Sequence, residues 1–247
     1  MTSKQVVDRA RSSTRVTTTL DANIHELAAG LAARFAPVLL PGEAMPDMTF
    51  FVALAARLLT RAHAQLDEAD RAHEAELSDD PAARAERDDA ASEVRETLTS
   101  LRSAVISAGG SAAARALSVP SRLPSDTSSL ERYAAGFHSA LLDPTRVVVN
   151  TSRAGIVLDR RAMAATLAPE LTRLQVALKN VAKEAAELGL TQTAKDKAIE
   201  ANDRTFTGVA NVIEGLLTLG NREDLAARVR PSRRRPGTIE LEDEGEG

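Results

Sequence analysis

The sequence predicts an all-α protein, an elongated helical bundle built from two tandem helical hairpins with approximate internal two-fold symmetry. Of its 247 residues 45 are alanine, and aromatic residues make up only 2%, with one tyrosine and no tryptophan. Helices suit this composition, because alanine, leucine, glutamate and arginine lose little freedom there, whereas sheets favour β-branched and aromatic residues. Apolar residues also recur at three- and four-residue intervals along most of the chain. A third observation, a repeated Pro-Ser-Arg segment, divides the chain into two similar halves.

The first half begins with a polar segment. Residues 1–19 are rich in serine, threonine and arginine, and we expect a flexible basic arm with a short extended piece at 16–20. From residue 21 apolar side chains recur at helical spacing, and this first helix should end near Pro37.

Two long helices are expected to form the first hairpin. Asp47 is a candidate N-cap for a helix that runs to about Leu77. Its predicted buried stripe consists of Phe51, Leu54, Leu58, Ala62, Leu66, Ala69, His73 and Leu77. The sequence Ser-Asp-Asp-Pro, ending at Pro81, predicts a tight turn into a second helix that ends at Gly109-Gly110. A short helix at about 111–117 follows.

The second half repeats this order. Ser128 and Glu131 form the pattern of a capping box for a helix that runs to about Leu141. The β-rich run at 146–151 predicts a short strand or an extended connection. The remaining predicted elements are a helix at 159–188 with a kink or break at Pro169, a hairpin tip at 188–193, a helix ending at Gly220 and a short helix at 222–228.

A near-repeat at an offset of about 111 residues supports an internal duplication. It pairs Leu98 with Val209, Leu101 with Val212, Val105 with Leu216, Gly109 with Gly220, and Pro120, Ser121 and Arg122 with Pro231, Ser232 and Arg233. Two hairpins could cover each other's apolar faces as a bundle. The expected domains are a flexible basic arm at 1–19, hairpin repeats at 20–124 and 125–236, and an acidic disordered tail at 237–247.

Composition excludes several kinds of site. The chain has no cysteine, so it has no thiolate nucleophile and no cysteine-based metal site. A net charge of −4 provides no general attraction for nucleic acid. No apolar run reaches the ~18–20 residues that span a bilayer, and the N-terminus has no apolar core of a signal peptide. We therefore expect a cytoplasmic protein with no membrane partner.

The histidines do not form a metal-binding pattern. The four are His25, His63, His73 and His138. A carboxylate-bridged di-metal bundle needs Glu-x-x-His on two helices, and the nearest match here, Asp70-x-x-His73, occurs once. No Gly-x-Ser-x-Gly nucleophile elbow is present either. We expect no catalytic residue, no metal site and no bound cofactor, and interpret the histidines as structural.

Several charged or glycine-rich segments could be either ligand sites or ordinary structural features. Ser111 follows two glycines at a helix start that could bind an anion, but this turn is better interpreted as a helix stop. The acidic segment 67–80 is a candidate cation site or a solvated hairpin tip. Arg122, Arg230 and Arg233–Arg235 would favour nucleic-acid binding if they formed one patch, although aromatic residues are not interleaved with them.

The C-terminus has a basic block followed by an acidic one. The last ten residues contain five acids, and Ile239 and Leu241 alternate with glutamates there. Such a segment could add a strand to a partner's sheet or serve only to solubilise the chain. Since ordering costs ~1–2 kcal/mol per residue, we expect 231–247 to be mobile in the free protein.

These observations favour a non-enzymatic scaffold or adaptor that binds a protein partner through its helical surface and charged tail. One alternative is a small-molecule- or metal-binding bundle, which a polar cavity at His63 or His73 would favour. A second is a nucleic-acid-associated protein with an arginine patch. The sequence leaves the identity of the partner and a homo-oligomer open.

Overall fold

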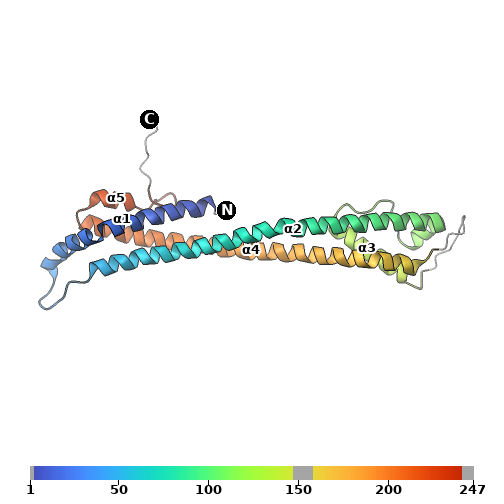
Figure 1. Cartoon of the computed structure of the whole chain (residues 1–247), viewed down its shortest axis with the longest axis horizontal. Helices are drawn as coiled ribbons and strands as arrows, with labels where there is room; N and C mark the ends of the chain where they lie inside the picture. Colours follow the sequence, from blue (N-terminus) through green and yellow to red (C-terminus); the bar gives the residue numbers. More distant parts are fainter. Residues whose placement is uncertain (1–2, 147–157, 241–247) are drawn as a thin grey trace, which may run out of the picture. The chain divides into compact units, whose positions relative to one another are not determined.

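A computed structural model of the chain describes residues 3–146 and 158–240. Its elements are α1 (Lys4–Phe35), the 3-10 turn η1 (Ala36–Val38), α2 (Met48–Ala116), α3 (Thr127–Leu142), α4 (Arg160–Leu219) and α5 (Glu223–Val229) (Figure 1). These ranges contain no strand, only an isolated antiparallel bridge between Pro231 and Ile239. The all-α prediction is confirmed. Most of the β-rich run at 146–151 lies outside the described residues.

The chain is a helical bundle divided into two compact units. Unit 1 comprises Met1–Glu76 and Leu188–Gly247, and unit 2 comprises Leu77–Glu187. Unit 1 has a core from α1, the first part of α2, the last part of α4, α5 and the segment after it. Unit 2 has its own core, from the rest of α2, α3 and the first part of α4. Each unit therefore draws on both of the repeats expected from the sequence.

Residues 4–20 are helical, which corrects the expectation of a flexible arm and of an extended piece at 16–20 for this part of the chain. Buried residues of α1 are Val6, Ser12, Ser13, Val16, Leu20, Leu27 and Leu31. The hydroxyl groups that lower its helix propensity are bonded locally: Ser12 Oγ donates to Asp8 O at 3.1 Å and Thr19 Oγ1 to Arg15 O at 2.8 Å. The burial of one face of α1 then stabilises the helix by more than the weak helix propensity of its serines and threonines costs.

The two predicted hairpin turns are wrong, because the long helices continue through them. α2 keeps helical backbone at Pro81, and α4 continues through Pro169 and the predicted tip at 188–193. A proline inside a helix costs about 3 kcal/mol. The continuous helix is still possible because α1, of which the sequence predicted only the part from residue 21, already covers the first part of α2. Folding α2 back on itself is unnecessary.

Other helix ends agree with the sequence. Gly110 interrupts α2 with φ 60° and ψ −156°, and the chain returns to a helix up to Ala116. α1 ends just before Pro37, and α5 lies within one residue of its expected range. The capping box expected at Ser128 and Glu131 is wrong, because the N-cap of α3 is Asp126, whose side chain accepts the Ser129 amide at 2.8 Å.

The segment that follows α5 is docked on unit 1, contrary to the mobility expected from residue 231. Ile239 is buried, and its amide donates to Ser12 Oγ at 3.3 Å. Two backbone bonds, Glu240 N to Arg230 O and Ser232 N to Thr238 O, both 2.8 Å, close a small hairpin. Because the hairpin pairs its own polar groups, only one apolar side chain is needed to anchor it. Residues 241–247 lie outside the described residues.

Candidate functional site

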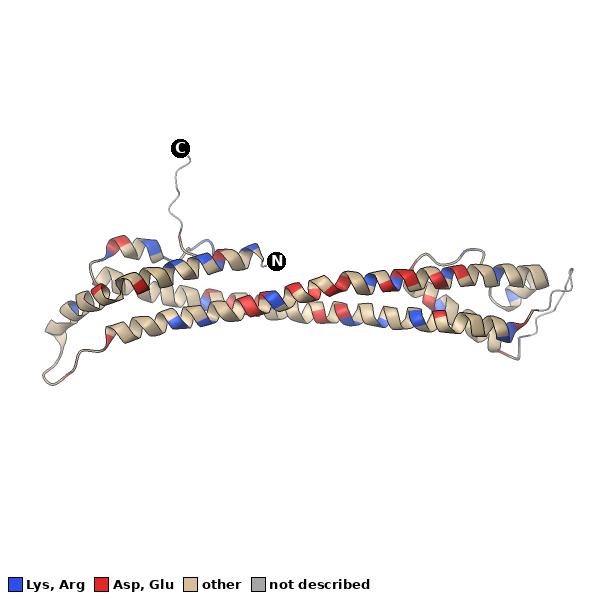
Figure 2. Cartoon of the chain, in the orientation of Figure 1, with Lys and Arg blue, Asp and Glu red and all other residues tan. Residues whose placement is uncertain are grey.

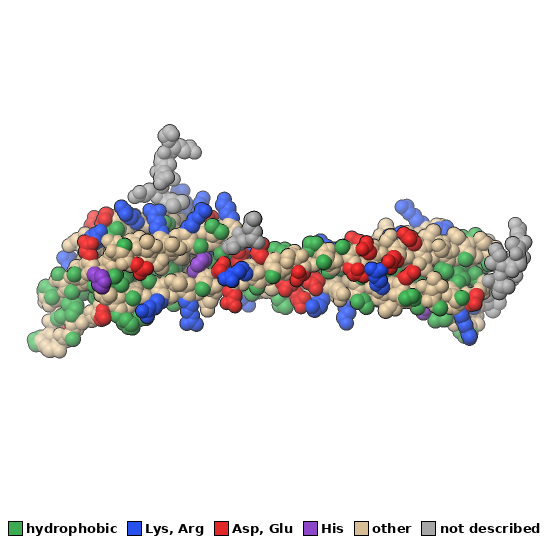
Figure 3. Space-filling model, viewed as in Figure 1, with side chains coloured by type: hydrophobic (Ala, Val, Ile, Leu, Met, Phe, Trp, Pro, Cys, Tyr) green, Lys and Arg blue, Asp and Glu red, His purple; other side chains and the backbone are tan. Residues whose placement is uncertain are grey.

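An unpartnered row of large apolar side chains runs along the first turns of α2. We call Phe50, Phe51, Leu54 and Leu58 the apolar stripe; they are 55%, 47%, 44% and 53% exposed. Val38 and Leu40 on the preceding connection are also exposed. Figure 3 shows hydrophobic side chains gathered over this connection and the start of α2.

The stripe is exposed because the first part of α2 has two apolar faces and only one of them is covered. Its inward face consists of Val52, Leu59 and Leu66, spaced seven residues apart and fully buried. Phe51, Leu54 and Leu58 belong to the other face, so their predicted burial is wrong, whereas the prediction for Leu66 and His73 is confirmed. Because both faces are apolar at helical spacing, the periodicity of the sequence does not indicate which of them is buried.

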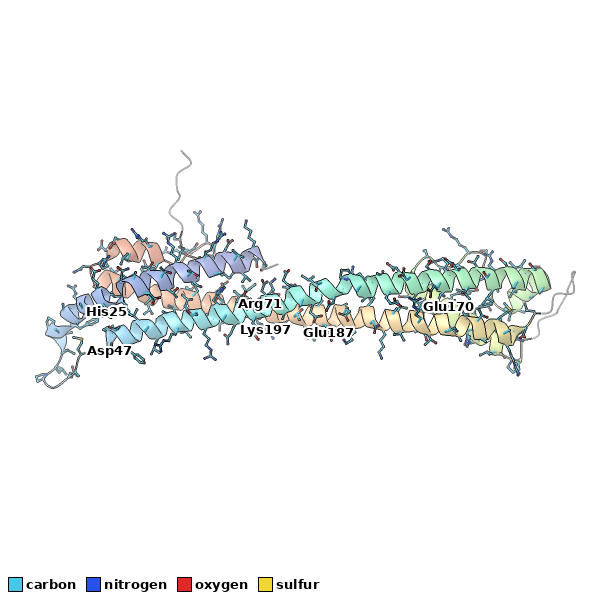
Figure 4. The ribbon with its side chains drawn as sticks, viewed as in Figure 1. His25, Asp47, Arg71, Glu170, Glu187 and Lys197 are labelled. Atoms are coloured by element: carbon cyan, nitrogen blue, oxygen red, sulfur yellow. The ribbon has the colours of Figure 1, made fainter. Side chains whose placement is uncertain are left out.

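Charged residues lie at both ends of the stripe. At its start, Asp47 caps α2, as predicted, by accepting the Phe50 amide at 2.9 Å (Figure 4). Arg57 and Arg61 follow on the same face; both are exposed, and neither has an ion-pair partner among the described residues. Figure 2 shows the uncharged first turns of α2 between an acidic residue and the basic residues further along. The face therefore has opposite charges at opposite ends.

A buried ion pair lies further along α2 within unit 1. Lys195 Nζ of α4 is 2.7 Å from Asp70 Oδ1, and the Ser3 amide donates to Asp70 Oδ2 at 3.0 Å. Asp70 is fully buried and Lys195 nearly so. Burial raises the pKa of Asp70, but the hydrogen bonds from Lys195 and Ser3 outweigh it and leave the pKa below its ordinary value. The pair joins α2 and α4 to the start of α1.

The structure does not bring the histidines together into a site. His73 is buried, with Nδ1 3.2 Å from Thr191 Oγ1, and His25 is exposed on α1 (Figure 4). His63 lies beside α1, and His138 is on α3 in unit 2. In the described part of the chain, none of the four belongs to a group of three potential metal ligands.

Three of the seven acids in the segment 67–80 form ion pairs with basic residues of the described chain. Asp70 binds Lys195, Asp67 binds Arg71 one turn along, and Asp80 binds Arg84 at 2.8 Å. These contacts account for three of the acids without a cation.

The arginines considered for nucleic-acid binding are divided between the units. Arg122 belongs to unit 2, whereas Arg230 and Arg233–Arg235 belong to unit 1. Arg230 Nε is 2.8 Å from Glu214 Oε1, while the other three are exposed. Neither unit by itself contains the whole predicted patch.

An open groove of about 710 Å³ follows α1 in unit 1. Its lining includes Arg11 and Arg15 of α1, His63 and Asp67 of α2, and Arg228 of α5. His63 Nδ1 is buried without a hydrogen-bond partner in the described residues. The groove could accommodate a small polar molecule, since ligand sites commonly measure ~300–1,000 Å³.

Comparison with known proteins adds no assignment: no family model, no curated protein and no solved structure matches this chain. None of the described helices is long and apolar enough to cross a membrane.

Proposed function

We propose that this protein is a non-enzymatic helical scaffold or adaptor of the cytoplasm that binds a protein partner through its helical surface. The observation that carries the proposal is the apolar stripe on α2. Single exposed apolar residues are ordinary, but a contiguous group that includes two phenylalanines is typical of an interaction surface. Aromatic residues, phenylalanine included, are also enriched in interfaces relative to the rest of the protein surface.

The size of the surface fits a protein contact. The exposed fractions of the stripe, Val38 and Leu40 together equal about 3.4 complete side chains. At ~150–200 Å² each, they amount to roughly 500–700 Å² of apolar area. A standard interface buries about 800 Å² on each partner, so these residues would supply most of one side.

The charged C-terminal segment is proposed as a second contact. Arg233–Arg235 are exposed at the bend of the small hairpin that Ile239 anchors, and an acidic sequence follows. Opposite charges in separate blocks would accelerate and orient encounter with a partner more than they would increase affinity.

Photo-crosslinking tests the proposed function. A photoreactive residue in place of Leu54 should give discrete crosslinked products containing the chain and a protein partner, identified by mass spectrometry. The same residue in place of Lys197, exposed on α4 away from the stripe (Figure 4), is the control. Equal or absent crosslinking at both positions would contradict the proposal.

The groove beside α1 favours a second candidate function, binding of a small anionic molecule. Arg11, Arg15 and Arg228 supply positive charge, and the free nitrogen of His63 could donate or accept a hydrogen bond. Thermal-shift screening with carboxylates and phosphate esters tests this, with His63→Ala as the variant that should lose any stabilisation.

We also propose that the two halves share an origin by duplication, with approximate two-fold symmetry. Gly110 has φ 60° and Asn221, 111 residues on, has φ 59°, and each precedes a short helix and a Pro-Ser-Arg sequence. Leu98 and Val209 are both buried, but Leu101 is buried while its counterpart Val212 is 45% exposed. An experimental structure in which 94–116 and 205–227 fail to superpose would contradict this.

A further inference from the structure

We propose that the apolar stripe is a self-association surface, on which α2 of a second copy packs antiparallel with Leu54 at the two-fold axis. The inference rests on the proposed function, because it names the protein partner of the stripe. It commits to a second copy because the arrangement of charges and apolar groups along α2 is complementary to its own reverse.

The spacing places one row of residues on a single face. Asp47, Leu54 and Arg61 are separated by seven residues, close to two helical turns, and all three are exposed. The other exposed stripe residues fall between them, at three- and four-residue steps. Asp47 and Arg61 thus lie on either side of Leu54, each about 10.5 Å away along the axis.

An antiparallel pair centred on Leu54 brings opposite groups together. Position 47 of one copy lies across from 61 of the other, so each Asp47 faces an Arg61, twice by symmetry. Asp47 uses Oδ1 to cap its own helix. Its carboxylate retains acceptor capacity for a partner's guanidinium, since an ionised carboxylate has about four lone-pair sites.

The same register matches the remaining exposed side chains. Phe50 lies across from Leu58 of the second copy, which makes two equivalent apolar contacts. Phe51 lies across from Arg57, a pair suited to cation–π stacking. A parallel arrangement would instead place Asp47 beside Asp47, and Arg57 and Arg61 beside their own copies, so like charges disfavour it.

The area of the stripe fits a weak, reversible dimer. In this register the apolar residues that meet the second copy are those of the stripe, whose exposed fractions together equal about two complete side chains, or roughly 300–400 Å² of apolar area on each copy. The ~600–800 Å² of apolar area buried in total lies below the ~1,200–2,000 Å² of standard specific interfaces. We therefore expect a dissociation constant of ~10–100 μM rather than an obligate dimer.

Charge-swap variants of the full chain test the register. Arg61→Glu should place Asp47 opposite a second carboxylate, and Asp47→Arg should place two guanidinium groups together, so each variant alone should dimerise at least about tenfold more weakly. Mixed in equal amounts, the two variants should form a heterodimer. One of its two ion pairs is then the unchanged pair of Asp47 with Arg61, and in the other pair both charges are reversed, so no position 47 faces a like charge at position 61. Lys197→Glu, with the same charge change as Arg61→Glu but off the stripe, is the matched control.

Sedimentation velocity at about 1–100 μM provides the measurement. The wild type and the control should shift with concentration from the 26.2 kDa chain towards twice that mass. Leu54→Glu should remain a monomer; because Leu54 is already exposed, this change should not disturb folding, which circular dichroism checks. Asp47→Asn, which keeps a good helix cap, separates loss of charge from loss of the cap in the Asp47→Arg variant.

Three results would overturn the inference: a monomeric wild type throughout this range, an unweakened Leu54→Glu dimer, or mixed charge-swap variants that associate no better than either alone. If the wild type is monomeric but crosslinking at position 54 captures a different protein, the self-association is wrong and the proposed function stands. If crosslinking at that position also captures nothing, both are wrong.

Discussion

The buried pair of Asp70 and Lys195 allows a sharp prediction about stability. Lys195→Met would remove the ammonium group 2.7 Å from Asp70 Oδ1 while largely keeping the volume of the side chain. Asp70 would stay fully buried with only the Ser3 amide as a described donor. Leaving one partner of a buried pair uncompensated typically costs 3–5 kcal/mol, and we expect a loss of ~3 kcal/mol because Lys195 retains slight exposure.

Replacing both partners should have a much smaller effect. In Asp70→Leu/Lys195→Met no buried charge remains, so the free energy of unfolding should return to within ~1 kcal/mol of the wild type. Urea unfolding followed by circular dichroism measures all four members of this cycle. The matched control is Arg204→Met, which removes the cation of the exposed pair with Glu200 and should cost less than ~0.5 kcal/mol. A Lys195→Met protein as stable as the wild type, or a double variant as unstable as the single one, would refute the reasoning.

Three further predictions concern unit 1. Because the pKa of Asp70 is lowered in the folded protein, its contribution to the free energy of unfolding is complete above the unfolded pKa of ~3.9 and is lost as the pH falls through the lower folded pKa. The free energy of unfolding, measured in urea at a series of acid pH values, should therefore fall more steeply for the wild type than for Asp70→Asn. Asn202 is fully buried, and neither side-chain atom has a partner in the described residues; Asn202→Leu should raise the unfolding free energy by ~1–2 kcal/mol in urea melts, and a loss would contradict this. Gly237 has φ +76°, and a Cβ there would lie 1.9 Å from Asp203 Oδ1; Gly237→Ala should speed hydrogen exchange of the Ile239 amide at least about tenfold, whereas unchanged exchange would count against docking of this segment.

Much of the fold could be predicted from local signals, because these depend on few residues. The glycine at 110, the proline at 37 and the Asp47 cap each act on neighbouring backbone, and each marks a boundary where expected. Composition alone decided the all-α class. Pro81 misled because a proline inside a helix removes one hydrogen bond without having to end the helix. α2 continues through it although no residue between His73 and Ala90 is buried.

The errors at α1 and at the stripe have a common origin. Val6, Ser13, Leu20 and Leu27 recur every seven residues and are buried, but a serine within the row and the surrounding threonines obscured the pattern. Because only the part of α1 from residue 21 was predicted, Val16 and Leu20, which share a core with Val52 and Leu59, were missed, and the aromatic face at Phe51 was taken as the core. The identity of the exposed face depends on which helix covers the other, and a single helix's periodicity does not contain that information.

Disulfide formation by Leu54→Cys tests the account most directly. The chain has no cysteine, so any disulfide in this variant must join two copies. In the proposed dimer the two Leu54 side chains face each other at the axis, where Cα atoms can approach the ~4.4–6.8 Å that a disulfide requires. Under mild oxidation at micromolar concentration, Leu54→Cys should form the covalent dimer much faster than the exposed control Lys197→Cys. Equal rates for the two variants, or no dimer from either, would contradict a stripe that binds its own copy.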